Sequence, residues 1–349
     1  MVLMVWGCGE AGDDAAPGSS RPDAGSAVDA ELVDFAVDAA PDAAASVDGA
    51  LHDAQSTPEP SGLPFIPGPP PATFDCTADA EDFPRRAGSP PDCVDDLGCT
   101  VPLVVGHRGA GGQFSMVAPE NSMAALRAAA LMGLDGVELD VRHTRDGGLV
   151  VIHDSTVDRT TFGAGRVDEM TVAEVTALSL RPEGHPDLRG DFSCERVPAL
   201  TAVLDFVRGR FFVDLDVKTD RVDLVVAAVV AADALDHVYF STGNIDHALR
   251  ARALEPRLRV QIRPDTVDEY ASAMARFERA PEVVEIPQGQ LEAMAPVIAR
   301  NGQRVFVNVF GLDTQTLVTG EPAYAPVYMA GAHILQSEFP HLVLTSLGR

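Results

Sequence analysis

Lysine is almost missing from this sequence. Of the 26 basic residues in the 349-residue chain, only Lys218 is a lysine. Basic residues are also outnumbered by 52 aspartates and glutamates, which gives a formal net charge of −26 at pH 7. This excess of acid argues against nucleic acid as a partner, because binding to a phosphate backbone depends on basic side chains. A single lysine in an arginine-rich chain suggests that a chemical role explains it.

Long apolar runs are missing too. Beyond the first eight residues there is no run of eighteen apolar residues, so we expect no other segment to span a bilayer. The chain opens on a short apolar stretch ending in Val5-Trp6-Gly7-Cys8, which resembles the end of a bacterial lipoprotein signal, whose cysteine becomes the lipidated first residue. The charged segment that should precede it is missing, so we expect the true start to lie upstream. We predict an exported protein, either a cell-envelope lipoprotein anchored only through Cys8 or a secreted protein.

Large apolar residues are scarce from Gly9 to about Ala72, where Ala, Asp, Pro, Gly and Ser dominate. Residues 1–100 hold 19 acidic and 3 basic residues, so a net of −16 out of −26 lies there. Such a segment cannot bury enough surface to offset its ordering entropy. An acidic interaction tail is the alternative, which the dilution of the charge disfavours. We predict three parts: a lipoprotein-like N-terminus and disordered acidic tether (1–72), a cysteine-containing extension (73–100) and a catalytic domain (101–349).

Four cysteines remain once Cys8 is set aside: Cys76, Cys93, Cys99 and Cys194. Their spacing, Cys-x16-Cys-x5-Cys with the fourth far away, does not resemble a zinc site. In an exported chain they suggest two disulfides, and the sequence leaves three connectivities open. We expect at least one bridge to tie the extension, or the loop that carries Cys194, to the catalytic domain. Unpaired buried thiols are the alternative.

Carboxylates alternate with apolar residues in two predicted strands. The side-chain period of a strand is two, so Asp214, Asp216 and Lys218 share one face of the segment 211–218. In the segment 136–141, Glu138 and Asp140 share a face in the same way. An acidic face of a strand is usually the solvated face, which is the alternative reading of each segment taken alone.

Two further segments weaken that alternative. Each is a short apolar run, typical of a strand buried on both faces, and each stops at a histidine: His107 and His153. Two strand ends with histidine and two with carboxylates suggest a barrel that carries a metal site at its mouth.

Strands alternate with helical segments along the rest of the chain, which indicates parallel βα units and an α/β fold. We predict a (β/α)8 TIM barrel preceded by the disordered tether. Nine candidate strands compete for its eight places: 103–107, 136–141, 149–153, 211–217, 237–241, 258–262, 283–286, 304–309 and 333–336. We expect 283–286 or 258–262 to lie outside the barrel, because both are short. Helices are predicted at 121–132, 224–232, 246–254, 267–279 and 291–300.

These segments resemble the glycerophosphodiester phosphodiesterase family of the phospholipase-C-like phosphodiesterase superfamily. The resemblance covers roughly residues 101–347 and is most specific in its first half. It is carried by motifs that follow one another in order: His107-Arg108-Gly109-Ala110, Ala118-Pro119-Glu120-Asn121-Ser122, Glu138-Leu139-Asp140-Val141, Thr144-Arg145-Asp146-Gly147, His153-Asp154 and Asp158-Arg159-Thr160-Thr161.

The ends of the barrel strands share one mouth, where Glu138, Asp140 and Asp216 would supply oxygen ligands. Three carboxylates without cysteine suit one divalent cation, Mg²⁺ or Ca²⁺. His107 and His153 are predicted to divide the base and acid roles across a scissile phosphodiester.

Two cations are predicted to bind the phosphate: Arg108 by a fork and Lys218 as a point charge. The resemblance gives Glu120 a supporting role, orienting Arg108 or a metal-bound water. Asp154 either orients His153 or caps the following turn. Asp214 lies two residues deeper in its strand and is expected to support the site rather than bind the cation.

The chain departs from the family pattern in three ways. Asp216 stands where the family commonly has glutamate in Glu-x-Lys, similar to the sphingomyelinase D branch, so the reach is one methylene shorter. The loop from Gly111 to Val117 is longer than in the simplest members, which bears on the shape of the substrate entrance. Asn308-Val309 and Ser337-Glu338 replace the usual Trp-Thr and Thr-Asp, changes expected to touch specificity rather than chemistry.

The resemblance implies a metal-dependent glycerophosphodiester phosphodiesterase acting on a small-molecule substrate. In this reaction a neighbouring glycerol hydroxyl attacks phosphorus, and water then opens the cyclic phosphate. One alternative is a phospholipase or sphingomyelinase D-like enzyme on intact lipids, which a hydrophobic rim of Phe114, Met116 and Phe162 would favour. The other is a catalytically retired barrel that binds lipid headgroups, which the joint presence of both histidines, three carboxylates and the lysine disfavours.

Overall fold

The computed structural model describes residues 69–78, 83, 90–112, 117–182 and 188–349. Most of the predicted tether, with the proposed lipidation site Cys8, lies outside the described residues, and so do Phe114 and Met116. No helix in the described part of the chain is long and apolar enough to cross a membrane.

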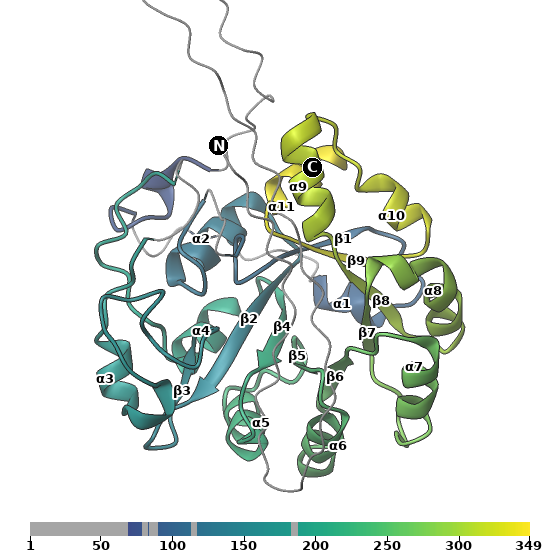
Figure 1. The fold of residues 1–349 in the computed structure, drawn as a ribbon, viewed down its shortest axis with the longest axis horizontal. Helices are drawn as coiled ribbons and strands as arrows, with labels where there is room; N and C mark the ends of the chain where they lie inside the picture. The colour runs from purple at the N-terminus through teal and green to yellow at the C-terminus, as the bar shows by residue number, and fades with distance from the viewer. Residues whose placement is uncertain (1–68, 79–82, 84–89, 113–116, 183–187) are drawn as a thin grey trace, which may run out of the picture. The chain divides into compact units, whose positions relative to one another are not determined.

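Eight parallel strands form a closed barrel with helices between them (Figure 1). The pairing runs from β1 through β2, β4, β5, β6, β7 and β8 to β9, and β9 pairs with β1 again. The predicted (β/α)8 TIM barrel is therefore confirmed. The strands are β1 (Leu103–Gly106), β2 (Gly136–His143), β4 (Phe212–Val217), β5 (Val238–Thr242), β6 (Arg259–Ile262), β7 (Val283–Ile286), β8 (Arg304–Asn308) and β9 (Ile334–Ser337).

The ninth strand, β3 (Leu149–Val151), lies outside the barrel and pairs antiparallel with the long end of β2. Our expectation that 258–262 or 283–286 would be excluded is wrong, because these segments form β6 and β7. The connection from β2 to β3 explains the error. It is the five-residue turn 144–148, in which Gly147 has φ 79°, whereas parallel neighbours need a crossover of about a dozen residues or more.

A helix follows each barrel strand and covers the outside of the sheet. α2 shows how the sequence sets its limits: the Ser122 side chain accepts from the Ala125 N–H at the start, and Gly133 ends the helix with φ 74°. The helices are α2 (Met123–Met132), α4 (Leu200–Val207), α5 (Val222–Ala231), α6 (Ile245–Leu254), α7 (Val267–Met274), α8 (Leu291–Arg300), α9 (Phe310–Thr319), α10 (Ala325–Met329) and α11 (Pro340–Ser346). Only α7 is markedly shorter than predicted.

Side-chain alternation along β4 shows how the barrel interior is layered. Val213, Leu215 and Val217 point outward and join the apolar cluster beneath the helices. Phe212 belongs to a second apolar cluster that fills the lower end of the barrel, and Asp214 and Asp216 follow it toward the mouth. The interior therefore changes from apolar to acidic along one strand.

Helix α1 (Pro90–Asp95), in the N-terminal extension, packs against the lower end of the barrel. In α1, Val94 packs into the lower apolar cluster, and Arg304 at the start of β8 donates from Nε to the Val94 carbonyl at 3.0 Å. Cys93 is bonded to Cys99 within the extension, and Cys76 is bonded to Cys194 in the loop before α4. Both expected disulfides are present, and the structure supplies the connectivity that the sequence left open.

Candidate active site at the barrel mouth

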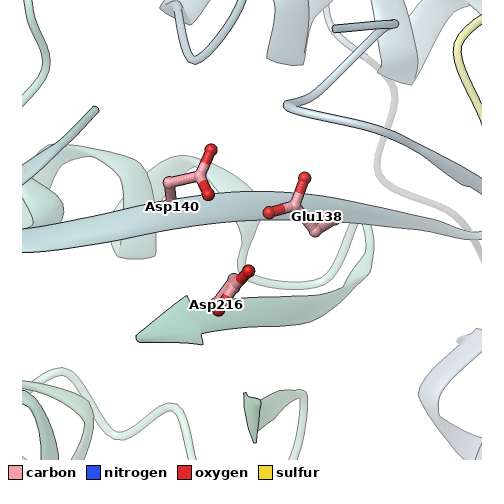
Figure 2. Close-up of side chains that lie close together, drawn as sticks. All are labelled: Glu138, Asp140 and Asp216. Carbon is pink, nitrogen blue, oxygen red and sulfur yellow. The ribbon is translucent and has the colours of Figure 1, made fainter. Parts of the chain in front are cut away.

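Three buried carboxylates meet at the mouth of the barrel (Figure 2). Glu138 and Asp140 lie on β2 and Asp216 lies on β4, where Asp140 and Asp216 are in register. One oxygen of each carboxylate lies within 4.8 Å of those of the others. The three residues predicted to hold a cation are therefore brought together by neighbouring parallel strands.

The charges of these carboxylates act on one another. Burial, with the neighbouring Asp140 and Asp216, raises the pKa of Glu138 well above its ordinary value. Burial acts in the same direction on Asp140, but Arg108 and Lys218 hold the pKa of Asp140 below its ordinary value. A dication relieves repulsion of this kind, and an all-oxygen ligand set suits Mg²⁺ or Ca²⁺. The residues present therefore fit one hard divalent cation.

Two basic side chains form ion pairs with Asp216. Lys218, just after β4, places Nζ 2.7 Å from Asp216 Oδ2 and 3.6 Å from Asp140 Oδ1. Arg263, just after β6, forks onto Asp216 with NH1 to Oδ2 at 2.8 Å and NH2 to Oδ1 at 2.9 Å. Burial opposes their effect, yet Arg263 and Lys218 keep the pKa of Asp216 below its ordinary value. Our sequence analysis did not identify Arg263.

Arg108 lies at a turn where φ is 50° and contacts the acidic cluster from the β1 side. Its backbone N–H donates to Glu138 Oε2 at 2.8 Å, and its NH1 donates to Glu120 Oε1 at 2.9 Å. Glu120 also accepts two hydrogen bonds from Arg159, at 2.7 and 2.9 Å. Of the two supporting roles considered for Glu120, orientation of Arg108 matches these contacts.

His107 lies between two carboxylates at the end of β1. Its Nδ1 is 2.7 Å from Glu338 Oε1, and its Nε2 is 3.7 Å from Glu138 Oε2. The Phe310 ring lies beside it, with centroids 4.7 Å apart. Burial opposes ionisation of Glu338, but the charges of His107 and Arg108 lower its pKa. Glu338, which we expected to touch specificity, is therefore a direct partner of the predicted acid/base group.

Glu338 is held in turn by Asp313 on α9. The Asp313 carboxylate accepts from the Glu338 N–H at 2.7 Å, from Ser337 Oγ at 2.7 Å and from the Tyr324 hydroxyl at 2.8 Å. Burial raises the pKa of Asp313 to about 7 even though these donors oppose the shift. The loop after β9 is thus tied to α9 through a buried carboxyl group.

His153 comes from the β3 hairpin instead of a barrel strand. Its Nδ1 lies 2.7 Å from Asp154 Oδ1, and Arg159 Nε donates to Asp154 Oδ2 at 2.7 Å. Arg142 on β2 donates to the His153 carbonyl at 2.7 Å. Asp154 thus contacts His153 directly, as the first of the two roles left open for it requires; that role stays a prediction. The preceding residue, Ile152, donates its backbone N–H to the Asp140 carbonyl at 3.0 Å, so the hairpin ends beside Asp140.

The sequence matches a family model described as the glycerophosphoryl diester phosphodiesterase family, over residues 107–315. The chain belongs to this family. The matched residues include both histidines and all three carboxylates of the mouth.

Curated relatives carry corresponding names. Glycerophosphodiester phosphodiesterase 1 of Mus musculus is 43% identical over 126 residues, 36% of this chain and 36% of the mouse protein. The glycerophosphodiester phosphodiesterase of Caldanaerobacter subterraneus subsp. tengcongensis is 34% identical over 165 residues, 45% of this chain and 65% of that protein. The chain thus matches about a third of the length of the first relative and just under two thirds of the second.

Solved structures agree on the fold. The glycerophosphodiester phosphodiesterase from Agrobacterium tumefaciens has a TM-score of 0.58 and 27% identity, covering 70% of this chain and 100% of that chain. An Oleispira antarctica phosphodiesterase solved in complex with sn-glycerol-3-phosphate has a TM-score of 0.58 and covers 72% of this chain and 99% of that chain. At 22% identity, the second likeness shows the fold alone.

Asp214 of this phosphodiesterase family member lies deeper in the barrel than the three clustered carboxylates. It accepts from Gln261 Nε2 at 2.7 Å, and Gln261 also contacts Glu285 on β7 at 3.1 Å. Burial, with the nearby Glu285 charge, raises the pKa of Asp214 to about 8. These contacts agree with the expectation that Asp214 supports the site without belonging to the ligand group.

Phe162, from the expected hydrophobic rim, lies at the surface, whereas Asn308 and Val309, at the usual Trp-Thr position, are at least partly buried. Phe162 is 68% exposed, with the Arg181 guanidinium 5.3 Å from its ring centroid. Asn308 donates to Glu285 at 2.8 Å, and Val309 is buried. The aromatic ring that contacts His107 belongs to the next residue, Phe310.

Proposed function

We propose that this protein is a metal-dependent glycerophosphodiester phosphodiesterase that releases glycerol 3-phosphate and an alcohol. One observation carries the proposal: a buried group of three carboxylates fits one divalent cation, with His107 3.7 Å from Glu138 and the residue before His153 hydrogen-bonded to the Asp140 backbone. Family membership and the names of the curated relatives support the same substrate class.

A neighbouring carboxylate orients each of the two histidines for proton transfer. Each Nδ1 lies 2.7 Å from a carboxylate oxygen, of Glu338 for His107 and of Asp154 for His153. A carboxylate at Nδ1 favours the tautomer that keeps the N–H there and leaves Nε2 to take or give a proton. One histidine then accepts the proton of the attacking hydroxyl, and the other protonates the leaving alcohol.

The remaining groups bind and orient the phosphate. Glu138, Asp140 and Asp216 would hold Mg²⁺ or Ca²⁺, which would neutralise negative charge on the phosphodiester. Arg108 and Lys218 add donors where negative charge grows in the transition state. The neighbouring glycerol hydroxyl attacks phosphorus, and water opens the resulting cyclic phosphate.

We also propose that the protein is exported, with Cys8 as a lipid anchor. The two disulfides support this proposal, because such bonds persist mainly in oxidising compartments. Labelling with a radioactive fatty acid would test it, and a Cys8→Ala variant that labels equally would contradict the anchor.

The intramolecular attack can be tested with a matched pair of substrates. A glycerophosphodiester with its neighbouring hydroxyl free should be cleaved, and its methyl-capped analogue should be inert. Placement of that hydroxyl can lower the barrier by several kcal/mol, on the order of 7 or more. Phosphorus NMR should also show a transient cyclic phosphate. Equal cleavage of both substrates would mean direct attack by water instead.

A further inference from the structure

Arg263 has no part in the function proposed above, although it binds one of the three clustered carboxylates through both terminal nitrogens of its guanidinium. Its NH1 and NH2 each donate to a different oxygen of Asp216, at 2.8 and 2.9 Å. Asp216 is also one of the three residues that would hold the cation. The oxygens of Asp216 would therefore be needed both for the ion pair with Arg263 and for binding the cation.

The charges around Asp216 show why the ion pair with Arg263 opposes binding of a divalent cation. Lys218 already lies 2.7 Å from Asp216 Oδ2 and 3.6 Å from Asp140 Oδ1. Arg108 Nε lies 3.5 Å from Asp140 Oδ2. With Arg263, three basic side chains contact the group of three carboxylates. An added dication would meet repulsion from each of these cations at short range in a buried site.

Arg263 is the basic side chain that we expect to change partners. Its side chain is 21% exposed, against 9% for that of Arg108, so Arg263 is not sealed inside the barrel. Its Nε is buried and, among the described residues, has no hydrogen-bond partner. Lys218 can hold Asp216 in place alone, and a guanidinium fork matches two phosphate oxygens as well as it matches a carboxylate.

We propose that Arg263 is an exchangeable counterion: it pairs with Asp216 while no divalent cation is bound, and it turns to the substrate phosphate once the cation takes that carboxylate. Arg263 thereby makes metal and substrate binding cooperative. The bound cation and the bound phosphate each favour the position of Arg263 away from Asp216. The inference rests on the proposed metal-dependent function and adds to it a third phosphate-binding cation besides Arg108 and Lys218.

Metal binding in the absence of substrate tests the first half of the proposal. Calorimetric titration of the whole protein with Ca²⁺ should show at least about tenfold tighter binding for Arg263→Gln, because one nearby positive charge is gone. Arg263→Lys keeps the charge and should stay close to wild type. Arg259→Gln is the matched control: this residue begins the same strand, pairs with Asp95 at the other end of the barrel and should leave Ca²⁺ affinity unchanged.

Binding of glycerol 3-phosphate to the Ca²⁺-loaded protein tests the second half. Arg263→Gln should weaken it by about tenfold or more, the scale of losing a charge-assisted contact. Arg263→Lys should weaken it less, because a point charge replaces the fork. Unchanged or weaker Ca²⁺ binding by Arg263→Gln, or unchanged glycerol 3-phosphate binding, would overturn the proposal. Absence of Ca²⁺ and Mg²⁺ binding in the wild-type protein would instead overturn the metal site itself.

Discussion

The two halves of the barrel contribute to the mouth in different ways. The half from β1 to β4 supplies the two histidines, the three clustered carboxylates, Arg108 and Lys218, and these groups lie in short contiguous motifs. The half from β5 to β9 supplies further partners of these groups, each as a single residue and not within a run of site residues: Arg263, Phe310, Asp313 and Glu338. The contact of Asp154 with His153 is therefore local in the sequence, whereas the contact of Glu338 with His107 depends on closure of the barrel.

Closure acts through register. β1 and β9 pair in parallel, with Gly106 opposite Ser337. The next residues, His107 and Glu338, therefore leave the barrel side by side although 231 positions separate them. A change of one residue in this pairing would separate the histidine from its carboxylate, because alternate residues of a strand face opposite sides.

Removal of either histidine, both of which lie in the β1 to β4 half of the barrel, should have the largest effect on activity. His107→Ala and His153→Ala should each lower turnover by at least about a hundredfold, the scale of losing a positioned acid or base. Turnover of a soluble glycerophosphodiester is the measurement. His247→Ala, on α6, serves as the control and should keep full activity. Near-wild-type turnover of either site variant in folded protein would exclude the two-histidine mechanism.

A pair of carboxylate variants compares the two halves directly. Glu338→Gln should lower kcat at least about tenfold, because the amide no longer fixes the tautomer of His107. Asp154→Asn should cost less, since the Asp154 side chain is 28% exposed and that of Glu338 only 12%, so water can replace part of the lost contact.

The control for this pair is Glu321→Gln, an exposed residue between α9 and α10. It should leave kcat unchanged. If Glu338→Gln also keeps wild-type kcat while Asp154→Asn does not, the second half of the barrel does not position the chemistry.

The smallest expected effect concerns a residue in the second half of the barrel, His341, that has no part in the proposed site. Its replacement should change the stability of the protein and leave the chemistry alone. Burial lowers the pKa of His341, on α11, to about 4. The unfolded chain gains a proton near pH 6.5 while the folded protein stays neutral, so stability is full above about pH 6.5 and falls by roughly 1.4 kcal/mol per pH unit down to about pH 4. Urea unfolding of His341→Leu should therefore depend less on pH between 7 and 5 than wild type does. An identical pH dependence would contradict this account.

The sequence predicted the barrel and brought out the residues of the mouth from β1 to β4, because strand alternation and the His and carboxylate motifs are local signals. It failed where geometry depends on connection length. The segment 149–153 looks like a buried barrel strand, and only the five-residue turn before it shows that it must fold back as a hairpin.

Arg263 and Glu338 show the second limit. Arg263 follows a short strand, and a position just after a barrel strand was the one available signal for it. Nothing in the sequence distinguishes it from the other arginines that end strands or helices. Glu338 stood in a recognised motif position, but its contact with His107 follows from the β1–β9 register, which no local pattern records.

Hydrolysis of glycerophosphocholine with and without a chelator tests the central claim most directly, namely that one divalent cation and the groups around it perform the reaction. The account predicts release of glycerol 3-phosphate and choline by wild-type protein, loss of that activity after exhaustive chelation, and its return when Mg²⁺ or Ca²⁺ is added back. Full activity after chelation would contradict the metal site formed by Glu138, Asp140 and Asp216.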